Sequence, residues 1–278
     1  MPTLSIGPFS FPLLLLVGVV AIILGLMVTV VSDNQRPRRA ESLLSRWLII
    51  AVVAGRIAFV SQYASIYQDH PWSMLDLRDG GFSLPWALAI LLVGVTLTAW
   101  RRPATRRALL AGTFAGISVL GMGYAGAHLW GNQQGMELPE LTLSTLDGSR
   151  VPLSQFHGKP AVINLWATWC PPCRREMPVL AHGQKQHGNL HFIFANQREA
   201  SETIRDYLDD ENLDLDNILI DAEGKLAQSI QSNGLPTTIF LDASGHVVDI
   251  RIGELSEATL NDRIQALVRN GQTLPAQE

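Results

Sequence analysis

The chain of 278 residues contains only two cysteines, Cys170 and Cys173, which are separated by Pro171 and Pro172. Two cysteines this close together cannot staple a loop-rich secreted scaffold, so their role is expected to be chemical. The seven scattered histidines offer no second ligand pair at a spacing that zinc requires, and no metal site is predicted. A dithiol at this spacing suits thiol–disulfide exchange, which requires no cofactor.

A buried strand followed directly by a helix is expected to position the two thiols. The apolar run 161–166 predicts the strand, and the helix is predicted to run through about Gly183. Cys170 falls in the first helical turn, where unpaired N–H groups and the helix dipole stabilise a thiolate, so it is predicted to be an exposed nucleophile. Cys173 lies one turn further on and faces inward, which suits a resolving thiol. Pro171 and Pro172 fit the first turn and stiffen the dithiol loop.

The residues around this unit follow a mixed α/β pattern. The segments 139–144 and 151–153 predict a hairpin, and 191–196 predicts a second buried strand. Further elements are expected as a helix over 199–211, a strand over 217–221, paired strands over 237–242 and 246–252, and a closing helix over 254–269. Together they predict a central mixed sheet flanked by helices over residues 137–278.

The composition of the whole chain points to a membrane component. Hydrophobic residues make up 47% of the chain, charged residues only 17%, and the mean hydropathy is +0.17. Residues 1–130 carry a net charge of +5 and residues 131–278 a net charge of −9, which gives no basic patch for nucleic acid. The two halves are therefore expected to lie in different surroundings.

Four apolar stretches in residues 1–130 have about the length that a membrane-spanning helix requires. They lie at about 11–31, 47–65, 83–100 and 109–128. The sequence thus predicts an all-α, four-helix transmembrane domain, followed by a polar linker at 131–136. Arginines concentrate between spans one and two and between spans three and four, which places those loops in the cytoplasm. Both ends of the membrane domain, and the α/β domain after it, are then expected in the periplasm of a bacterial inner membrane.

One cation, Arg56, lies inside the second predicted span, where a charge costs roughly 3 kcal/mol. It is either a contact for an anionic headgroup or substrate, or a structural group with a partner, and the sequence leaves both open. The run 55–60, with Tyr63, Pro71 and 79–83, resembles the amino-terminal part of prolipoprotein diacylglyceryl transferases over about residues 5–125. That family continues with a His-Gly-Gly stretch, where this chain has residues 84–87, Leu-Pro-Trp-Ala. This departure from the family pattern favours an anchor or partner-docking module, with lipid transfer, which the resemblance implies, as the alternative.

A second resemblance covers about residues 137–270. The run 166–178, WATWCPPCRREMP, together with 236–238 and Gly253, resembles TlpA-like periplasmic thioredoxin-family oxidoreductases. The resemblance implies a thioredoxin fold, a cis bond before Pro236 opposite the dithiol, and a Leu235 backbone that pairs with substrate. Thioredoxins carry an Asp six residues before the first Cys. Here that position is Asn164, and the TlpA-like branch places its acid at Glu176, where it would exchange the proton of Cys173.

These observations predict a membrane-anchored periplasmic thiol–disulfide oxidoreductase that works as a protein-disulfide reductase. Its catalytic residues are expected to be Cys170, Cys173, Glu176 and Pro236. The substrate is expected to contact Trp169, Pro171, Pro172 and Leu235. The expected partners are disulfide-containing periplasmic proteins, with apocytochrome c as one candidate, a separate membrane reductant, and the lipid bilayer. The alternatives are a lipid-modifying transferase with an appended redox domain and a non-enzymatic membrane scaffold.

Overall fold

The computed structural model describes residues 3–6, 9–33, 37–67, 72, 74, 79–130, 138, 140–232 and 234–273. The chain divides into two compact units. One is Phe11–Gly131, and the bulk of the other is Asn132–Glu278.

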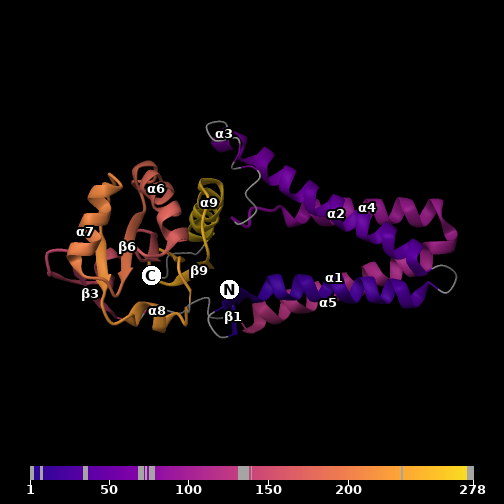
Figure 1. Cartoon of the computed structure of the whole chain (residues 1–278), viewed down its shortest axis with the longest axis horizontal. Helices are drawn as coiled ribbons and strands as arrows, with labels where there is room; N and C mark the ends of the chain where they lie inside the picture. The colour runs from indigo at the N-terminus through magenta and orange to yellow at the C-terminus, as the bar shows by residue number, and fades with distance from the viewer. Residues whose placement is uncertain are drawn as a thin grey trace. The chain divides into compact units, whose positions relative to one another are not determined.

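The first unit consists of long apolar helices. Its elements are α1 (Leu13–Ser32), α2 (Pro37–Gln62), α3 (Ala64–Tyr67), α4 (Leu84–Arg101), the 3₁₀ helix η2 (Pro103–Thr105) and α5 (Arg106–Trp130). Strands β1 (Thr3–Ile6) and β2 (Phe9–Pro12) form a two-stranded sheet before α1. The helices pack mainly as two pairs, α1 with α5 and α2 with α4 (Figure 1).

Each of the four predicted spans corresponds to one apolar helix. Within the described residues, three stretches are long and apolar enough to cross a membrane: Arg39–Gln62, Leu84–Arg101 and Pro103–Gly126. The described apolar part of α1, Leu16–Ser32, is shorter than that length, so the first span stays a prediction. Large apolar side chains such as Phe114 are mostly exposed on these helices, as expected of a surface that faces lipid.

Small residues let α1 and α5 approach each other closely. A Cβ added at Gly112 would lie 1.8 Å from Thr29 Oγ1, and one at Gly116 would lie 3.2 Å from the carbonyl oxygen of Ala21. Such spacing brings two backbones together without large side chains between them, which is how helices pack tightly in lipid. Gly112 and Gly116 therefore allow α1 and α5 to pack against each other.

The second unit is built on a seven-stranded mixed sheet with the strand order β4-β3-β7-β6-β5-β8-β9. The strands are β3 (Thr142–Thr145), β4 (Arg150–Pro152), β5 (Ala161–Trp166), β6 (His191–Gln197), β7 (Ile218–Asp221), β8 (Thr237–Leu241) and β9 (Val247–Ile252). The helices are η3 (Leu153–Phe156), α6 (Pro171–Gln186), α7 (Ser201–Asp210), α8 (Lys225–Ser229) and α9 (Glu257–Thr273). Strand β5 runs parallel to β6 and antiparallel to β8.

Alternation along β5 divides the core between the two faces of the sheet. Val162 and Trp166 belong to a cluster that includes residues of α6, α7 and α9, while Ile163 and Leu165 belong to a cluster that includes residues of η3 and α8. Asn164 has the parity of Val162 and Trp166, so it points toward the α6 face. This parity sets a polar side chain directly beneath the helix that carries the cysteines.

The predicted order of elements in this unit is confirmed, with shifts at their ends. Helix α6 continues to Gln186 instead of ending at about Gly183, and α7 begins at Ser201 instead of Glu199. Helix α9 begins at Glu257, three residues after its predicted start. The short helix α8 was not predicted.

Candidate functional site

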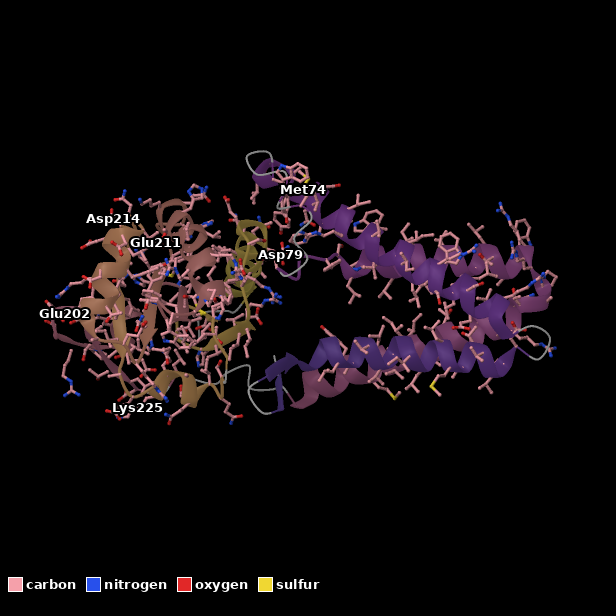
Figure 2. All side chains as sticks on the ribbon, viewed as in Figure 1. Met74, Asp79, Glu202, Glu211, Asp214 and Lys225 are labelled. Atoms are coloured by element: carbon pink, nitrogen blue, oxygen red, sulfur yellow. A yellow bond between two sulfur atoms is a disulfide. The ribbon has the colours of Figure 1, made fainter. Side chains whose placement is uncertain are left out.

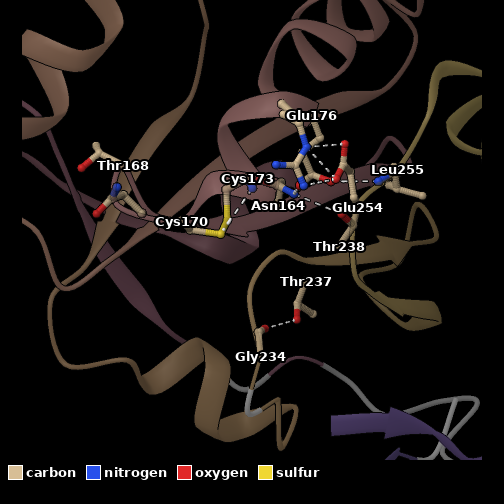
Figure 3. Close-up of a disulfide and its surroundings, with 12 residues drawn as sticks. Asn164, Thr168, Cys170, Cys173, Glu176, Gly234, Thr237, Thr238, Glu254 and Leu255 are labelled. Carbon is tan, nitrogen blue, oxygen red and sulfur yellow. Dashed lines mark hydrogen bonds and ion pairs between the residues drawn. A yellow bond between two sulfur atoms is a disulfide. The ribbon is translucent and has the colours of Figure 1, made fainter. Parts of the chain in front are cut away.

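The two cysteines lie at the junction of β5 and α6 and form a disulfide. Cys170 is the N-cap of α6, and its Sγ accepts a hydrogen bond at 3.3 Å from the N–H of Cys173 (Figure 3). Pro171 and Pro172 occupy the first helical positions, where an N–H would lack an intrahelical partner. The local geometry therefore follows from the sequence: an extended strand, a capping sulfur and a helix that starts with proline.

The exposure of Cys170 differs from the prediction. Cys170 is 3% exposed and Cys173 is fully buried, and both belong to the apolar cluster that contains Trp166 and Ala167. In the disulfide form, the bond to the inward-facing Cys173 draws the Cys170 sulfur into this cluster. The expectation of an exposed Cys170 is therefore wrong for the oxidised protein.

The residues expected to contact substrate differ in exposure. Trp169, next to Cys170, is 68% exposed, and Pro171 is also exposed. Leu235 is half-buried against the cluster that contains the cysteines, and the bond from Leu235 to Pro236 is cis, as predicted. The N–H and C=O groups of Leu235 form no hydrogen bond with any residue that the structure describes. They are therefore available for pairing with another chain.

Glu176 is fully buried on α6, three residues after Cys173. Its Oε1 accepts a hydrogen bond at 2.7 Å from Asn164 Nδ2, and its Oε2 accepts one at 3.0 Å from the N–H of Leu255 (Figure 3). Asn164 Nδ2 also donates to Thr238 Oγ1 at 3.1 Å. The carboxyl group on α6 is thus held by two other segments, strand β5 and the connection from β9 to α9.

The surroundings of Glu176 favour its neutral form. Burial raises the pKa of Glu176 from its ordinary value of 4.5 to about 8, although the Leu255 and Asn164 hydrogen bonds oppose this rise. Glu254 raises the pKa further and Arg251 lowers it. Arg175 forms a two-pronged ion pair with Glu254, with a shortest contact of 2.7 Å. A carboxyl group with this pKa can both accept and donate a proton near neutral pH.

A second carboxylate, Glu199, secures the loop before Cys170, and it was not predicted from the sequence. Glu199 Oε2 accepts hydrogen bonds from the N–H of Thr168 at 2.8 Å and from Asn196 Nδ2 at 2.7 Å. Its Oε1 accepts another from Thr168 Oγ1 at 2.5 Å. Thr168 is 31 residues earlier in the chain, so no local pattern connects the two. The loop that leads into the dithiol is therefore fixed to the end of β6.

Arg56 has partners within its own unit. Its Nη1 donates to Asp79 Oδ1 at 3.0 Å and to the carbonyl oxygen of Gly81 at 2.7 Å, and its Nε donates to the carbonyl oxygen of Met74 at 3.1 Å. Asp79 and Met74 are labelled in Figure 2. Arg56 and Asp79 are both buried. The guanidinium also lies within 6 Å of the ring centres of Phe59, Tyr67 and Phe82. Of the two interpretations left open, this geometry favours the structural one.

Comparisons with known proteins match each half of the chain separately. Residues 133–265 match the family model for Redoxin, and residues 3–138 match the one for Prolipoprotein diacylglyceryl transferase. Thioredoxin-like protein YneN of Bacillus subtilis (strain 168) is 30% identical over 160 residues, which cover 53% of this chain and 93% of YneN. Thiol-disulfide oxidoreductase ResA of the same organism is 25% identical over 142 residues, covering 50% of this chain and 78% of ResA. The solved structure of MTB DsbF is 27% identical with a TM-score of 0.43, covering 46% of this chain and 95% of that chain.

Proposed function

Because the carboxy-terminal half of this chain belongs to the thioredoxin-like family of thiol–disulfide oxidoreductases, we propose that the protein is a membrane-anchored reductase of disulfides in periplasmic proteins. The observation that carries this proposal is the Cys170–Cys173 pair at the start of α6 with the buried carboxyl of Glu176 on the same helix. A nucleophile, a resolving thiol and a proton carrier are then adjacent along one helix.

Cys170 is the attacking group in this mechanism. As the N-cap of α6 it lies at the positive end of the helix dipole, and the N–H of Cys173 points at its sulfur. Both features stabilise a thiolate once the disulfide is reduced. The Cys170 thiolate attacks one sulfur of the substrate disulfide, forms a mixed disulfide and releases the other substrate sulfur as a thiolate.

Cys173 and Glu176 complete the exchange. The thiol of Cys173 gives its proton to Glu176 and its sulfur attacks Cys170, which breaks the mixed disulfide and releases the second substrate thiolate. The released thiolates take up protons, so the substrate gains two electrons and the dithiol becomes a disulfide. A pKa of about 8 lets Glu176 accept this proton and later return it when the disulfide is reduced again.

Substrate recognition is assigned to the residues that frame the dithiol. Trp169 offers a large exposed ring beside Cys170, and Pro171 and Pro172 offer a rigid apolar edge. The open N–H and C=O groups of Leu235 suit pairing with an extended substrate segment, next to the cis bond before Pro236. Such main-chain pairing accepts many sequences, which fits a range of periplasmic proteins, including apocytochrome c.

Two cysteine variants test the roles of the two thiols, and the resting redox state of the pair tests the direction of exchange. Cys173→Ser is expected to accumulate mixed disulfides between Cys170 and substrate proteins in growing cells, whereas Cys170→Ser, the matched control, is expected to accumulate none. The resting state of the wild-type pair is measured by acid quench and thiol alkylation with a mass tag. A mainly reduced pair supports a reductase, and a mainly oxidised pair would contradict that direction.

The location rests on the arginine-rich loops of the helical unit. We propose four spans, with both ends of the membrane domain in the periplasm. A chain with Cys170→Ser and Cys173→Ser lacks thiols, so single cysteines can report on topology. Glu140→Cys is expected to react with a membrane-impermeant maleimide in spheroplasts, and Ala104→Cys only after lysis. The reverse pattern would contradict the proposed orientation.

The match of residues 3–138 to Prolipoprotein diacylglyceryl transferase keeps lipid transfer as the alternative function. This alternative predicts that the purified chain transfers a diacylglyceryl group to a lipoprotein precursor and that Arg56→Lys lowers this transfer. Transfer activity that survives Cys170→Ser would establish it as an independent function. If no transfer occurs with a precursor that a true transferase modifies, the alternative fails.

A further inference from the structure

The side-chain amide of Asn164 is unusual because only one of its two ends has partners. Asn164 is 1% exposed, and its Nδ2 donates to Glu176 Oε1 and to Thr238 Oγ1. Its Oδ1 is buried and has no hydrogen-bond partner among the described residues. A buried acceptor left without a donor costs free energy, so this arrangement requires an explanation.

The orientation shown suits an ionised Glu176. Both carboxylate oxygens then accept a hydrogen bond, Oε1 from Asn164 Nδ2 and Oε2 from the N–H of Leu255. The second hydrogen of Nδ2 goes to Thr238 Oγ1, which is directly opposite Asn164 in the paired strands β5 and β8. Each polar atom that faces the carboxylate is therefore a donor.

A protonated Glu176 needs the opposite orientation. Because the N–H of Leu255 donates to Oε2, a proton on Oε1 leaves Oε2 as a carbonyl acceptor, which is the stronger acceptor for that N–H. That proton would then face the hydrogens of Asn164 Nδ2, with donor against donor. If the amide turns by half a rotation, Oδ1 replaces Nδ2 and accepts from both Glu176 Oε1–H and Thr238 Oγ1–H.

This half-rotation breaks no hydrogen bond at the other end of the amide, because Oδ1 has none there. The hydroxyl of Thr238 serves as acceptor in one orientation and as donor in the other. The network can therefore satisfy the Glu176 carboxyl group in either protonation state with the same three side chains, and one end of the Asn164 amide lacks a partner among the described residues in each state, Oδ1 in one and Nδ2 in the other.

We propose that Asn164 is a positioning residue whose amide turns over each time Glu176 gains or loses its proton. This proposal deepens the proposed function, since it rests on Glu176 as the proton acceptor for Cys173. During resolution the Cys173 proton moves to the carboxylate, the Cys173 sulfur bonds to Cys170, and the electron pair of the mixed disulfide leaves with the substrate sulfur. The reversed amide then holds the neutral acid until the proton is returned.

The charged groups around Glu176 set the pH at which the amide turns. They are Arg251 on β9 and Glu254 in the connection from β9 to α9, while Arg175 of α6 pairs with Glu254. Asn164 of β5 and Thr238 of β8, the other side chains in this network, carry no charge. Changes at these charged residues would move the midpoint, and only changes at Asn164 or Thr238 would remove the amide's response.

The chain contains a matched control for Asn164. Asn196 on β6 is also fully buried, its Nδ2 donates to Glu199 Oε2 at 2.7 Å, and its Oδ1 likewise has no partner among the described residues. Asn196 is paired in register with Trp166, and its carboxylate partner is not Glu176. Asn164→Leu and Asn196→Leu therefore remove equivalent amides, of which only one contacts the proton carrier.

The first experiment separates attack from resolution. The reduced full chain in lipid nanodiscs reacts with an aromatic disulfide whose thiolate is coloured, so Cys170 releases the first thiolate and Cys173 the second. Asn164→Leu is expected to slow the second phase about tenfold at pH 7 and to move its pH midpoint upward, since a hydrogen bond to a charged group is lost. The first phase of Asn164→Leu is expected to keep its wild-type rate. Asn196→Leu is expected to keep the wild-type pH midpoint of the second phase, whatever it does to the rates, because Asn196 contacts Glu199 and not Glu176. A second phase with an unchanged pH profile in Asn164→Leu would overturn the proposal.

The second experiment detects the rotation in the unaltered protein. The full chain, labelled with ¹⁵N-asparagine, is studied by NMR in nanodiscs. The Asn164 signal is assigned through the peptide bond that joins Asn164 to the preceding residue, Ile163. Contacts between the Asn164 amide protons and the Thr238 side chain are expected above the midpoint and lost below it. Contacts that persist at every pH would show a fixed donor and overturn the proposal. If Glu176→Gln leaves the second phase unchanged, the proposed role of Glu176 fails instead, whatever the amide does.

Discussion

Replacing Glu176 by Gln should change how the stability of the α/β unit depends on pH. In the unfolded chain this carboxyl ionises near its ordinary pKa of 4.5, whereas in the folded protein burial holds the pKa at about 8. Between these values the folded state binds one more proton than the unfolded state, so the free energy of unfolding falls as the pH rises. The stabilisation is fully present below about pH 4.5 and is lost once the pH has passed through about 8.

The size of this loss follows from the same shift. A displacement from 4.5 to about 8, at roughly 1.4 kcal/mol for each pKa unit, amounts to about 5 kcal/mol. Because Gln does not ionise, Glu176→Gln removes this slope. The free energy of unfolding of the variant should therefore rise steadily relative to that of the wild type between pH 5 and 8. Above that range the difference between the two should stay constant.

Pulse proteolysis across a urea series measures this difference on the oxidised full chain in nanodiscs, at pH values from 5 to 9. Glu199→Gln is the matched control, because Glu199 is also a hydrogen-bonded carboxylate, with three donors, but is only half-buried. The control should keep the slope of the wild type. If the unfolding free energies of wild type and Glu176→Gln run parallel over the whole range, burial does not govern the ionisation of Glu176.

Three further substitutions test other parts of the structure. Arg56→Leu removes the cation that pairs with buried Asp79 and should lower the stability of the helical unit by about 3–5 kcal/mol, measured by thermal melting in detergent. The double variant Arg56→Leu/Asp79→Leu should recover part of that loss. Trp169→Ala should lower kcat/KM for a protein disulfide by about tenfold, as expected for an interface anchor, and leave reduction of a small aromatic disulfide unchanged. Gly112→Val, with its Cβ against Thr29, should destabilise the packing of α1 on α5 by about 1–3 kcal/mol in the same melting assay, whereas Gly121→Val, where nothing lies within 4 Å of the added Cβ, should not.

Elements with a strong local pattern were predictable from the sequence. The unbroken apolar run 161–166 predicted β5, and the two prolines after Cys170 predicted the start of α6. Helix α8 was missed because it has only five residues and begins after Gly224 in the left-handed region, at φ 70°. The other local feature that marks the start of α8 is Asp221, whose carboxylate accepts hydrogen bonds from the N–H groups of Lys225 and Leu226.

The site was only partly predictable, because its contacts join distant segments. Glu199 was assigned to the start of a helix, yet its carboxylate faces Thr168, and α7 begins two residues later. Leu255 and Glu176 are 79 residues apart, and no periodicity in the sequence connects them. Residue types and spacing therefore identified the reacting groups, whereas the residues that position them required the three-dimensional fold.

The helical unit has to serve the dithiol without carrying electrons through thiols of its own. Cys170 and Cys173 are the only cysteines of the chain, so no relay of disulfides can cross the membrane within it. Arg56, its buried cation, is held by Asp79 and by main-chain oxygens of the same unit, which favours a structural role over recognition of a substrate. Under the proposed function we expect a separate membrane reductant to reduce the Cys170–Cys173 disulfide, and we propose that the helices hold the α/β domain near that donor. Exchange of the helices for an unrelated single anchor should therefore slow this reduction while leaving exchange with substrate unchanged.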